Sequence, residues 1–157
     1  MQTLETCLWF DGQAEAAAAF YVSVFREAKL LGTTRYPEGL PQPAGSVLTV
    51  RFSLHGMVFT ALNGGPQYAF TPAISLVVTC DTQDEVDDYW QKLTVGGEEQ
   101  PCGWLKDRFG VSWQIVPRGL VELLVAPDKA GAQRAVQAML QMKKLDLATL
   151  RRAYDQA

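Results

Sequence analysis

One pattern of residues occurs twice in this chain of 157 residues, and the repetition restricts the fold more than any other feature. The stretch "CLWFDGQAEAAAAFY" from Cys7 matches "VVTCDTQDEVDDYWQ" from Val77, at a shift of 70 positions. The stretch "HGMVFTAL" from His55 matches "FGVSWQIV" from Phe109, at a shift of 54. The proline- and glycine-rich loop "YPEGLPQPAGS" accounts for the difference of 16. Two blocks in the same order indicate a duplicated unit.

Each copy has the pattern of a strand, a helix and three more strands. In the first copy, alternation and turn residues predict the strand Thr3–Phe10, the helix Gln13–Phe25 and the strands Leu30–Tyr36, Val47–Leu54 and Met57–Asn63, the last two joined at His55-Gly56. In the second copy, the strand Ala73–Cys80 precedes a helix. We predict an α+β fold in a single domain over 1–157: βαβββ modules at 1–65 and 70–118, then a C-terminal helical extension at 119–157.

The two helices are expected to begin differently. Thr82 and Glu85 form a capping box in the second copy, whereas the matching stretch of the first copy offers Gly12 as the cap. Apolar residues three and four positions apart predict the buried sides, which are Ala16, Phe20 and Val24 in the first helix and Val86, Tyr89, Trp90 and Leu93 in the second.

Strand alternation assigns residues to the two faces of each sheet. The row expected beneath the helices contains Phe59, Ala61, Ile74, Leu76, Val78, Trp113 and Ile115. The opposite face then carries Glu5, Cys7, Trp9, Thr60, Ser75 and Gln114. Such a mixture of polar and apolar side chains is typical of a cleft that binds a small, partly apolar molecule. The alternative is a sheet face that solvent or a second copy covers.

Cys102 and Trp104 lie on the loop and strand that lead to the second hairpin. They indicate either a reactive thiol beside an aromatic wall or a small buried hydrophobe packed on tryptophan, and both residues are candidates for the cleft lining. The single histidine, His55, is expected in a solvent-exposed hairpin turn. Because no imidazole is expected near the thiol, packing is the favoured interpretation.

The charge and the cysteine content indicate which partners and which cellular compartment the protein suits. The net charge of -3 and the pI near 5.1 argue against nucleic acid or an anionic membrane as partner, since both favour a basic surface. We expect no secretory signal, and no apolar run is long enough to cross a bilayer. Three cysteines at irregular spacing suit a reducing compartment, so we expect a cytoplasmic protein.

The residues from Leu120 onward lie outside the repeat. Helical spacing of apolar residues predicts two amphipathic helices that need a partner, one with Ala135, Met139 and Met142 and one with Leu147, Leu150 and Tyr154. The partner is either the chain's own sheet or a second copy. The open strand edges of two βαβββ modules favour a homodimer, with a monomer as the alternative.

Four segments resemble the PhnB-like branch of the glyoxalase/bleomycin-resistance/dioxygenase (vicinal-oxygen-chelate) superfamily. They are "LWFDGQAEAAAAFYVSVF", "FTPAISLVV", "GWLKDRFGVSWQIVP" and the closing "AMLQMKKLDLATLRRAY". The resemblance extends over nearly the whole chain. It implies paired βαβββ modules, which the repeat predicts independently, and modules that pair within or between chains. Proteins of this branch often carry the name demethylubiquinone methyltransferase.

The resemblance also implies where a metal would bind. In metal-dependent members of the superfamily, the first and last strands of each module supply four ligands, and the matching positions here are Glu5, Thr60, Ala73 or Ser75, and Gln114. Only Glu5 and Gln114 have side chains that suit the role, whereas a transition metal usually has three protein ligands. We therefore expect no metal and no other cofactor.

Methyl transfer has less support from the residues. A site for S-adenosylmethionine in a doubly wound domain needs a glycine-rich strand-to-helix turn, and "FDGQAE" lacks that glycine spacing. We predict a PhnB-like protein that binds a small molecule without metal and has no assigned reaction. Glu5, Cys7 and Cys102 are the only groups suited to catalysis. The alternatives are a methyltransferase and a non-catalytic binding or regulatory dimer.

Overall fold

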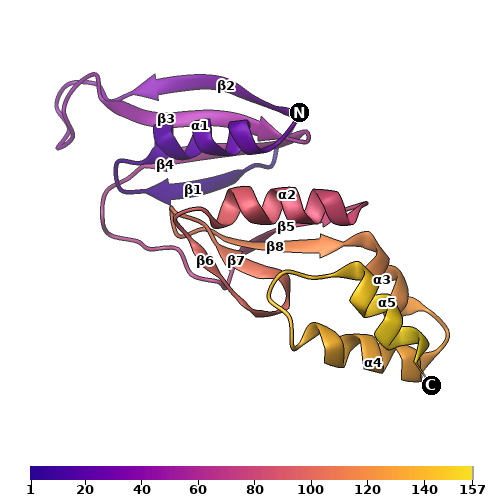
Figure 1. The fold of residues 1–157 in the computed structure, drawn as a ribbon. Helices are drawn as coiled ribbons and strands as arrows, with labels where there is room; N and C mark the ends of the chain where they lie inside the picture. The colour runs from indigo at the N-terminus through magenta and orange to yellow at the C-terminus, as the bar shows by residue number, and fades with distance from the viewer. Residues whose placement is uncertain (157) are drawn as a thin grey trace. The chain divides into compact units, whose positions relative to one another are not determined.

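The computed structural model describes residues 1–156, which form two compact units that divide after Phe70. The first unit, module 1, consists of β1 (Thr6–Phe10), α1 (Ala14–Val24), β2 (Ala28–Arg35), β3 (Val47–Leu54) and β4 (Met57–Asn63) (Figure 1). Its sheet has the order β1-β4-β3-β2, in which β1 is parallel to β4 and the other neighbours are antiparallel. β3 and β4 meet at His55 and Gly56, whose φ values of 49° and 79° are typical of a tight hairpin turn.

The second unit contains module 2 and the helices of the extension. Module 2 consists of β5 (Ser75–Cys80), α2 (Gln83–Thr94), β6 (Glu98–Glu99), the 3₁₀ turn η1 (Pro101–Gly103), β7 (Trp104–Lys106) and β8 (Ser112–Pro117). The extension consists of α3 (Arg118–Val125), α4 (Lys129–Met139) and α5 (Leu147–Asp155). The sheet order β5-β8-β7-β6, with β5 parallel to β8, repeats that of module 1. The predicted α+β fold with two βαβββ modules and C-terminal helices is confirmed.

α1 lies against its sheet (Figure 1). Aromatic side chains fill the space between the helix and the sheet. Tyr21 of α1 is fully buried, and its ring centroid lies 5.9 Å from that of Phe52 on β3. Phe52 stacks on Phe59 of β4 at 5.2 Å, with 11° between the ring planes. The small buried residues Ala14, Ala17 and Ala18 complete this side of the helix and permit a close approach to the sheet.

The buried side of α1 is displaced by one residue from the prediction. Ala16 is exposed and Phe20 only half-buried, whereas Ala17 and Tyr21 are buried; Val24 is buried as expected. The cause is one additional turn residue, because residues 11–13 separate β1 from α1 but only residues 81 and 82 separate β5 from α2. Gly12, with φ at +83°, is part of this longer turn. The N-cap of α1 is therefore Gln13, and the prediction that Gly12 caps the helix is wrong.

The buried side of α2 agrees with the prediction. Val86, Trp90 and Leu93 are buried and Tyr89 is half-buried. The Thr82 half of the capping box is present, since the Thr82 hydroxyl accepts from the Glu85 backbone N–H at 3.2 Å. The Glu85 carboxylate reaches one residue further back than in a standard box and accepts from the backbone N–H of Asp81 at 2.9 Å.

The row expected beneath the helices needs one correction. Phe59, Ala61, Trp113 and Ile115 are buried, and Leu76 and Val78 are half-buried. Ile74, by contrast, is 75% exposed because β5 begins only at Ser75, so this residue lies outside the sheet. β1 likewise begins at Thr6 rather than Thr3, which leaves Glu5 just before the strand.

The extension packs on the unit to which it belongs. Leu120, Leu145 and Leu150 form a buried cluster against which Val116 of β8 packs. The carbonyls of Met142 and Lys143 each accept a hydrogen bond at 2.8 Å, from the backbone N–H groups of Cys102 and Gly103. The apolar stripes of the tail therefore find their partner within module 2 and the extension. No helix in residues 1–156 is long and apolar enough to cross a membrane.

Candidate functional site

The face of the module 1 sheet opposite α1 brings together Glu5, Cys7, Trp9 and Thr60. Cys7 pairs with Thr60, and Thr60 pairs with Arg51, so these three residues form one row across β1, β4 and β3. The Glu5 carboxylate accepts hydrogen bonds from Arg51 Nη2 at 3.0 Å and from Thr60 Oγ1 at 3.2 Å. Arg51 is a polar member of this face that strand alternation alone did not single out, because its β3 position has no match in the repeat blocks.

The cysteine on this face is a poor nucleophile. Cys7 is exposed as a residue, but partial desolvation of its thiol, together with the nearby Glu5 carboxylate, raises its pKa. Since the thiolate is the reactive form of cysteine, a raised pKa lowers its reactivity at neutral pH. Cys80 lies on the other face of its sheet, where burial and the carboxylates of Glu85 and Asp81 raise its pKa to about 12. Cys7 therefore suits the role of a lining residue better than that of a nucleophile.

Trp9 is held in a fixed orientation on the same face. Its indole Nε1 donates to the Gly65 carbonyl at 2.8 Å, and its ring makes an edge contact with Tyr68 at 5.0 Å. A Cβ on Gly64 would lie 2.4 Å from the indole, so only glycine allows the chain to pass so close. An aromatic wall positioned in this way loses little side-chain entropy when a ligand packs on it.

The corresponding face of module 2 brings together Ser75, Trp104 and Gln114. The side-chain amide of Gln114 donates to the Ser75 hydroxyl at 2.9 Å. Trp104 is the cross-strand partner of Gln114 on β7, and Val77 is its partner on β5. All three predicted residues are half-buried.

Cys102 lies outside this group. It belongs to η1, before β7 begins, and has a left-handed backbone with φ at 64°. Its backbone N–H is bonded to the extension at Met142, and its side chain is half-buried and free of any disulfide. This placement fits the interpretation of Cys102 as a packing residue.

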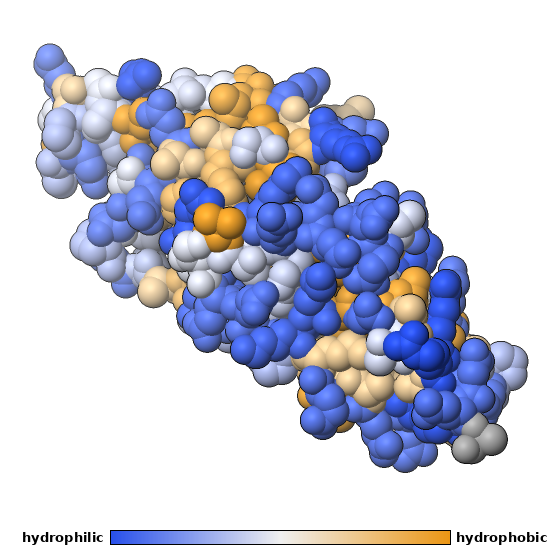
Figure 2. Space-filling model, viewed as in Figure 1, coloured by the Kyte–Doolittle hydropathy of each residue, from blue (hydrophilic) through white to orange (hydrophobic). Residues whose placement is uncertain are grey.

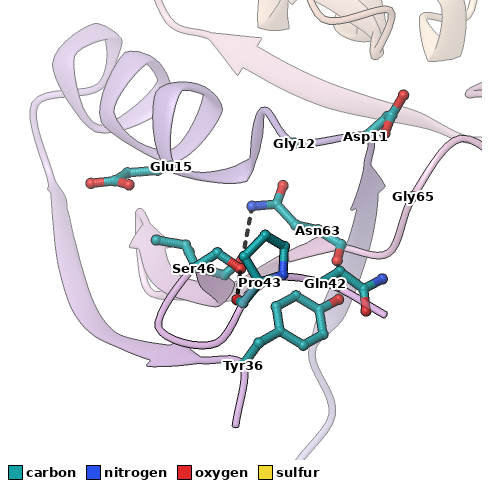
Figure 3. Close-up of a pocket in the computed structure, with 10 residues that line it drawn as sticks. Asp11, Gly12, Glu15, Tyr36, Gln42, Pro43, Ser46, Asn63 and Gly65 are labelled. Atoms are coloured by element: carbon teal, nitrogen blue, oxygen red, sulfur yellow. Dashed lines mark hydrogen bonds between the residues drawn. The ribbon is translucent and has the colours of Figure 1, made fainter. Parts of the chain in front are cut away.

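A hollow that the sequence did not suggest lies in module 1, where β1 turns into α1 (Figure 3). Its volume is about 360 Å³. The lining comes from the turn, from the end of β4 and from the long loop before β3, and comprises Asp11, Gly12, Glu15, Tyr36, Gln42, Pro43, Ser46, Val47, Asn63 and Gly65. These segments are distant in sequence, which is why no local pattern marks the hollow.

The polar groups at the centre of the hollow are bonded to one another. Asn63 Oδ1 accepts from the backbone N–H of Ala14 at 2.8 Å, and its Nδ2 donates to the Val47 carbonyl at 3.1 Å, the bond drawn in Figure 3. The Tyr36 hydroxyl donates to the Asn63 carbonyl. Asn63 thus ties the start of α1 to β3 and β4. These hydrogen bonds hold the turn, and the lining also includes the polar side chains of Asp11, Glu15 and Gln42.

The positions that bear metal ligands in the resembling superfamily do not fit a transition metal here. The Glu5 carboxylate is engaged by Arg51 and Thr60, and the amide of Gln114 donates to Ser75. Of the remaining candidates, Thr60 and Ser75 carry hydroxyl groups and Ala73 carries only a methyl group, so none offers an imidazole or a carboxylate. Within residues 1–156, no three His, Cys, Asp or Glu side chains gather closely enough to hold a metal ion.

Comparisons with known proteins by sequence and by structure point to the same family. A family model described as 3-demethylubiquinone-9 3-methyltransferase matches residues 2–116. The PhnB protein from Bacillus cereus is 36% identical in sequence, with a TM-score of 0.67, over 74% of this chain and 99% of that chain. Among proteins of curated function, none matches.

Two further solved structures share the fold at lower identity. The Pseudomonas aeruginosa protein PA1353 is 20% identical with a TM-score of 0.62, over 74% of this chain and 98% of its own. The fosfomycin resistance protein FosX from Mesorhizobium loti is 11% identical with a TM-score of 0.52, over 73% and 90%. The family match ends at residue 116, so α3, α4 and α5 lie beyond it.

Proposed function

Since this chain belongs to the family described as 3-demethylubiquinone-9 3-methyltransferase, the PhnB-like proteins, we propose that it binds a small, partly apolar molecule. The binding surface is the sheet face that the helix of each module leaves uncovered. One observation carries the proposal: in both modules that face carries hydrogen-bonding side chains and a tryptophan. Trp9 accompanies Glu5 and Thr60 in module 1, and Trp104 accompanies Gln114 and Ser75 in module 2. Such a combination orients a ligand while it buries apolar surface.

The same side chains favour binding over an assigned reaction. A catalyst needs a titratable or nucleophilic group poised at the site. Glu5 is held in an ion pair with Arg51, and the raised pKa of Cys7 keeps its thiol protonated at neutral pH. Once a substrate is known, the variants Glu5→Gln, Cys7→Ser and Cys102→Ser test catalysis, and full activity in all three would assign the reaction to other groups.

Screening a metabolite library by thermal shift is the experiment that tests the proposal. A ligand that binds only the folded state raises the melting temperature, by an amount that corresponds to about 2.7 kcal/mol at a hundredfold excess over Kd. We expect at least one such compound, with the shift lost in Trp9→Ala or Trp104→Ala and kept in Leu140→Ala, an exposed residue of the extension. A library without any stabilising compound would favour the alternative of a regulatory dimer that binds no small molecule.

The proposed binding does not use a metal ion, because the side chains at the ligand positions of the superfamily are unsuited to one. Elemental analysis of the purified protein is expected to find less than one transition metal per chain. About one zinc, iron or manganese per chain, lost in Gln114→Ala, would contradict this part of the proposal.

Methyl transfer is the second candidate function, and the match to a family model described as a methyltransferase is the observation that favours it. The turn between β1 and α1 contains a single glycine, Gly12, and lacks the glycine-rich form of nucleotide-binding turns. Transfer of a labelled methyl group from S-adenosylmethionine to a demethylated ubiquinol would establish this function. We expect no transfer above the level of a heat-denatured control.

We also propose that the protein is a cytoplasmic homodimer. Its three cysteines are free, as in reducing compartments. Figure 2 shows apolar colour over the surface where α1 lies, and the exposed residues of that helix include Ala16 and Ala19. β2 is the edge strand of its sheet and exposes Leu30 and Leu31. Edges and apolar faces of this kind are commonly paired in symmetric dimers. Sedimentation equilibrium at micromolar concentration tests this, and the mass of a single chain would refute it.

A further inference from the structure

A buried hydroxyl on β8 has no partner. Ser112 is 1% exposed, and its Oγ makes no hydrogen bond to any residue from 1 to 156. Burying a hydroxyl in this way destabilises a fold, and native proteins contain few such groups. The equivalent position in module 1, 54 residues earlier, is the apolar Val58. Since the fold accepts an apolar residue at this position, packing does not explain the serine.

The strand register shows which residues surround this hydroxyl. Ser112 pairs with Ser75 on β5 and with Lys106 on β7, so the three share the face opposite α2. In an antiparallel pair such as β7 and β8, side chains directly opposite one another have Cβ atoms about 4.5–5.5 Å apart, so the Lys106 side chain starts next to Ser112. The next row along the same face contains Val77, Gln114 and Trp104.

Lys106 brings an uncommitted positive charge to this row. Its side chain is half-buried and forms no ion pair within the described part of the chain. Glu98 is its cross-strand neighbour on β6 but is exposed and lies outside ion-pair distance. A half-buried ammonium attracts an anion more strongly than a fully solvated one, because less water screens it.

We propose that this face of module 2 takes a small aromatic carboxylate. One carboxylate oxygen accepts from the Lys106 ammonium and the other from the Ser112 hydroxyl, which gains the partner that it lacks. The aromatic ring packs on Trp104 and on Val77, which is 56% exposed. Ser75 holds the amide of Gln114 in place and leaves its Oε1 free to accept from a ring substituent. The flexible Lys106 side chain swings aside to admit the ligand. This inference rests on the proposed function and specifies its ligand class.

Benzoate is the probe for a titration followed by backbone-amide NMR, and benzamide is its neutral analogue of the same shape. We expect benzoate to bind wild-type protein at least tenfold more tightly than benzamide, because only the anion has a full charge to share with Lys106. In Lys106→Gln the affinity for benzoate should fall about tenfold and the preference over benzamide should disappear. Lys92→Gln is the matched control, since Lys92 lies on α2 and is paired with Asp88.

In Ser112→Ala, the melting temperature and the affinity for benzoate should change in opposite directions. Without ligand, its melting temperature should rise by about 2–4 °C, because an unsatisfied hydroxyl is removed. Its affinity for benzoate should nevertheless fall about tenfold. Ser75→Ala is the comparison variant, and its melting temperature should fall because Gln114 loses its hydrogen-bond partner.

Two results would overturn this inference and leave the proposed function standing. In the first, wild-type protein binds benzoate no better than benzamide while a library compound still binds this face. In the second, Ser112→Ala binds benzoate as tightly as wild type. If no compound of any class binds either sheet face, the proposed function itself fails.

Discussion

Modules 1 and 2 have the same topology but secure the start of their helices in different ways. α2 begins with a local cap, in which Thr82 accepts from the Glu85 backbone N–H three residues later. α1 has no side-chain cap of its own, and Asn63 at the end of β4 accepts from Ala14 instead, across 49 positions of sequence. A local cap is visible in the sequence, whereas a cap supplied from another strand depends on the finished fold.

The two modules also differ at the corner of each sheet, meaning the place where the parallel strands end and the helix begins. A different segment of the chain borders this corner in each module. In module 1 the long loop from Tyr36 to Val47 borders the corner and leaves the hollow of about 360 Å³. In module 2 the extension reaches the corner: the Gln83 side chain donates to the Leu145 carbonyl at 2.9 Å and accepts from the Leu147 backbone N–H at 2.8 Å. Duplicated modules can thus keep one topology while different segments complete the same corner.

The largest loss of stability is expected at the contact between the extension and module 2. Leu145 is 1% exposed and contacts Gly103 so closely that a Cβ on that glycine would lie 2.8 Å from Leu145 Cδ1. Leu145→Ala should lower the free energy of unfolding by about 2–5 kcal/mol, measured by urea denaturation. The matched control is Leu140→Ala, which is 56% exposed in the wild type and should change stability by no more than about 0.5 kcal/mol. Equal effects of the two variants would show that the extension is not docked as described.

The cap supplied by Asn63 should have the next largest effect. Asn63→Ala removes the acceptor for Ala14 and the donor to Val47, and should cost about 2 kcal/mol of unfolding free energy. Asn63→Asp keeps the acceptor at the start of α1 but sets a carboxylate oxygen against the Val47 carbonyl, so it should recover only part of the loss. If Asn63→Ala proves as stable as wild type, the cap across 49 positions has no energetic role.

The local cap of α2 should matter less. Thr82→Ala is expected to cost about 1 kcal/mol, the usual effect of losing one N-cap side chain, and Thr82→Ser should restore nearly all of it. Both values come from thermal or urea unfolding. A cost for Thr82→Ala larger than that for Asn63→Ala would reverse the ranking of the two helix starts.

The smallest effect concerns pH. The hydrogen bond from Lys144 lowers the pKa of Asp87, which joins α2 to the extension at 2.9 Å. A pKa lowered by folding means that the carboxylate stabilises the fold fully above its unfolded pKa of about 3.9, and that this stabilisation is lost as the pH falls through the folded value. Asp87→Asn should therefore be less stable than wild type at pH 7, by under 1 kcal/mol for so exposed a pair, and the difference should vanish near pH 2. A difference that persists at pH 2 would assign the effect to packing instead.

Much of this fold could be predicted because its signals are local. Strand alternation correctly predicted the first and last residues of β3 and β4, and the capping-box residues correctly predicted where α2 begins. The error in α1 arose because residues 16–22 are all apolar, so the apolar spacing fits more than one side of the helix. The turn around Gly12, which is one residue longer than its counterpart, decides which side is buried. A difference of one residue rotates a helix by about 100°, which is enough to exchange Phe20 for Tyr21 as the buried aromatic.

In the candidate site, too, the residues that local sequence patterns mark could be predicted, whereas those that depend on contacts between distant segments could not. Alternation placed Cys7, Trp9 and Thr60 on one face because neighbouring strands share their pleat. It did not single out Arg51 on β3 or the missing partner of the Ser112 hydroxyl, because both depend on the register between strands. The hollow was missed for a related reason, since its lining comes from residues 11 to 65 and only tertiary contacts bring them together.

The proposed function requires that the sheet faces opposite α1 and α2 bind the ligand. Backbone-amide chemical-shift mapping, with the most stabilising compound from the metabolite screen, tests it most directly. The largest shifts should fall on strands whose side chains line these faces, at Cys7 and Thr60 in module 1 or at Gln114 and its neighbours in module 2. Shifts concentrated on α1, on α2 or around the hollow, at Gly12 and Ser46, would contradict it.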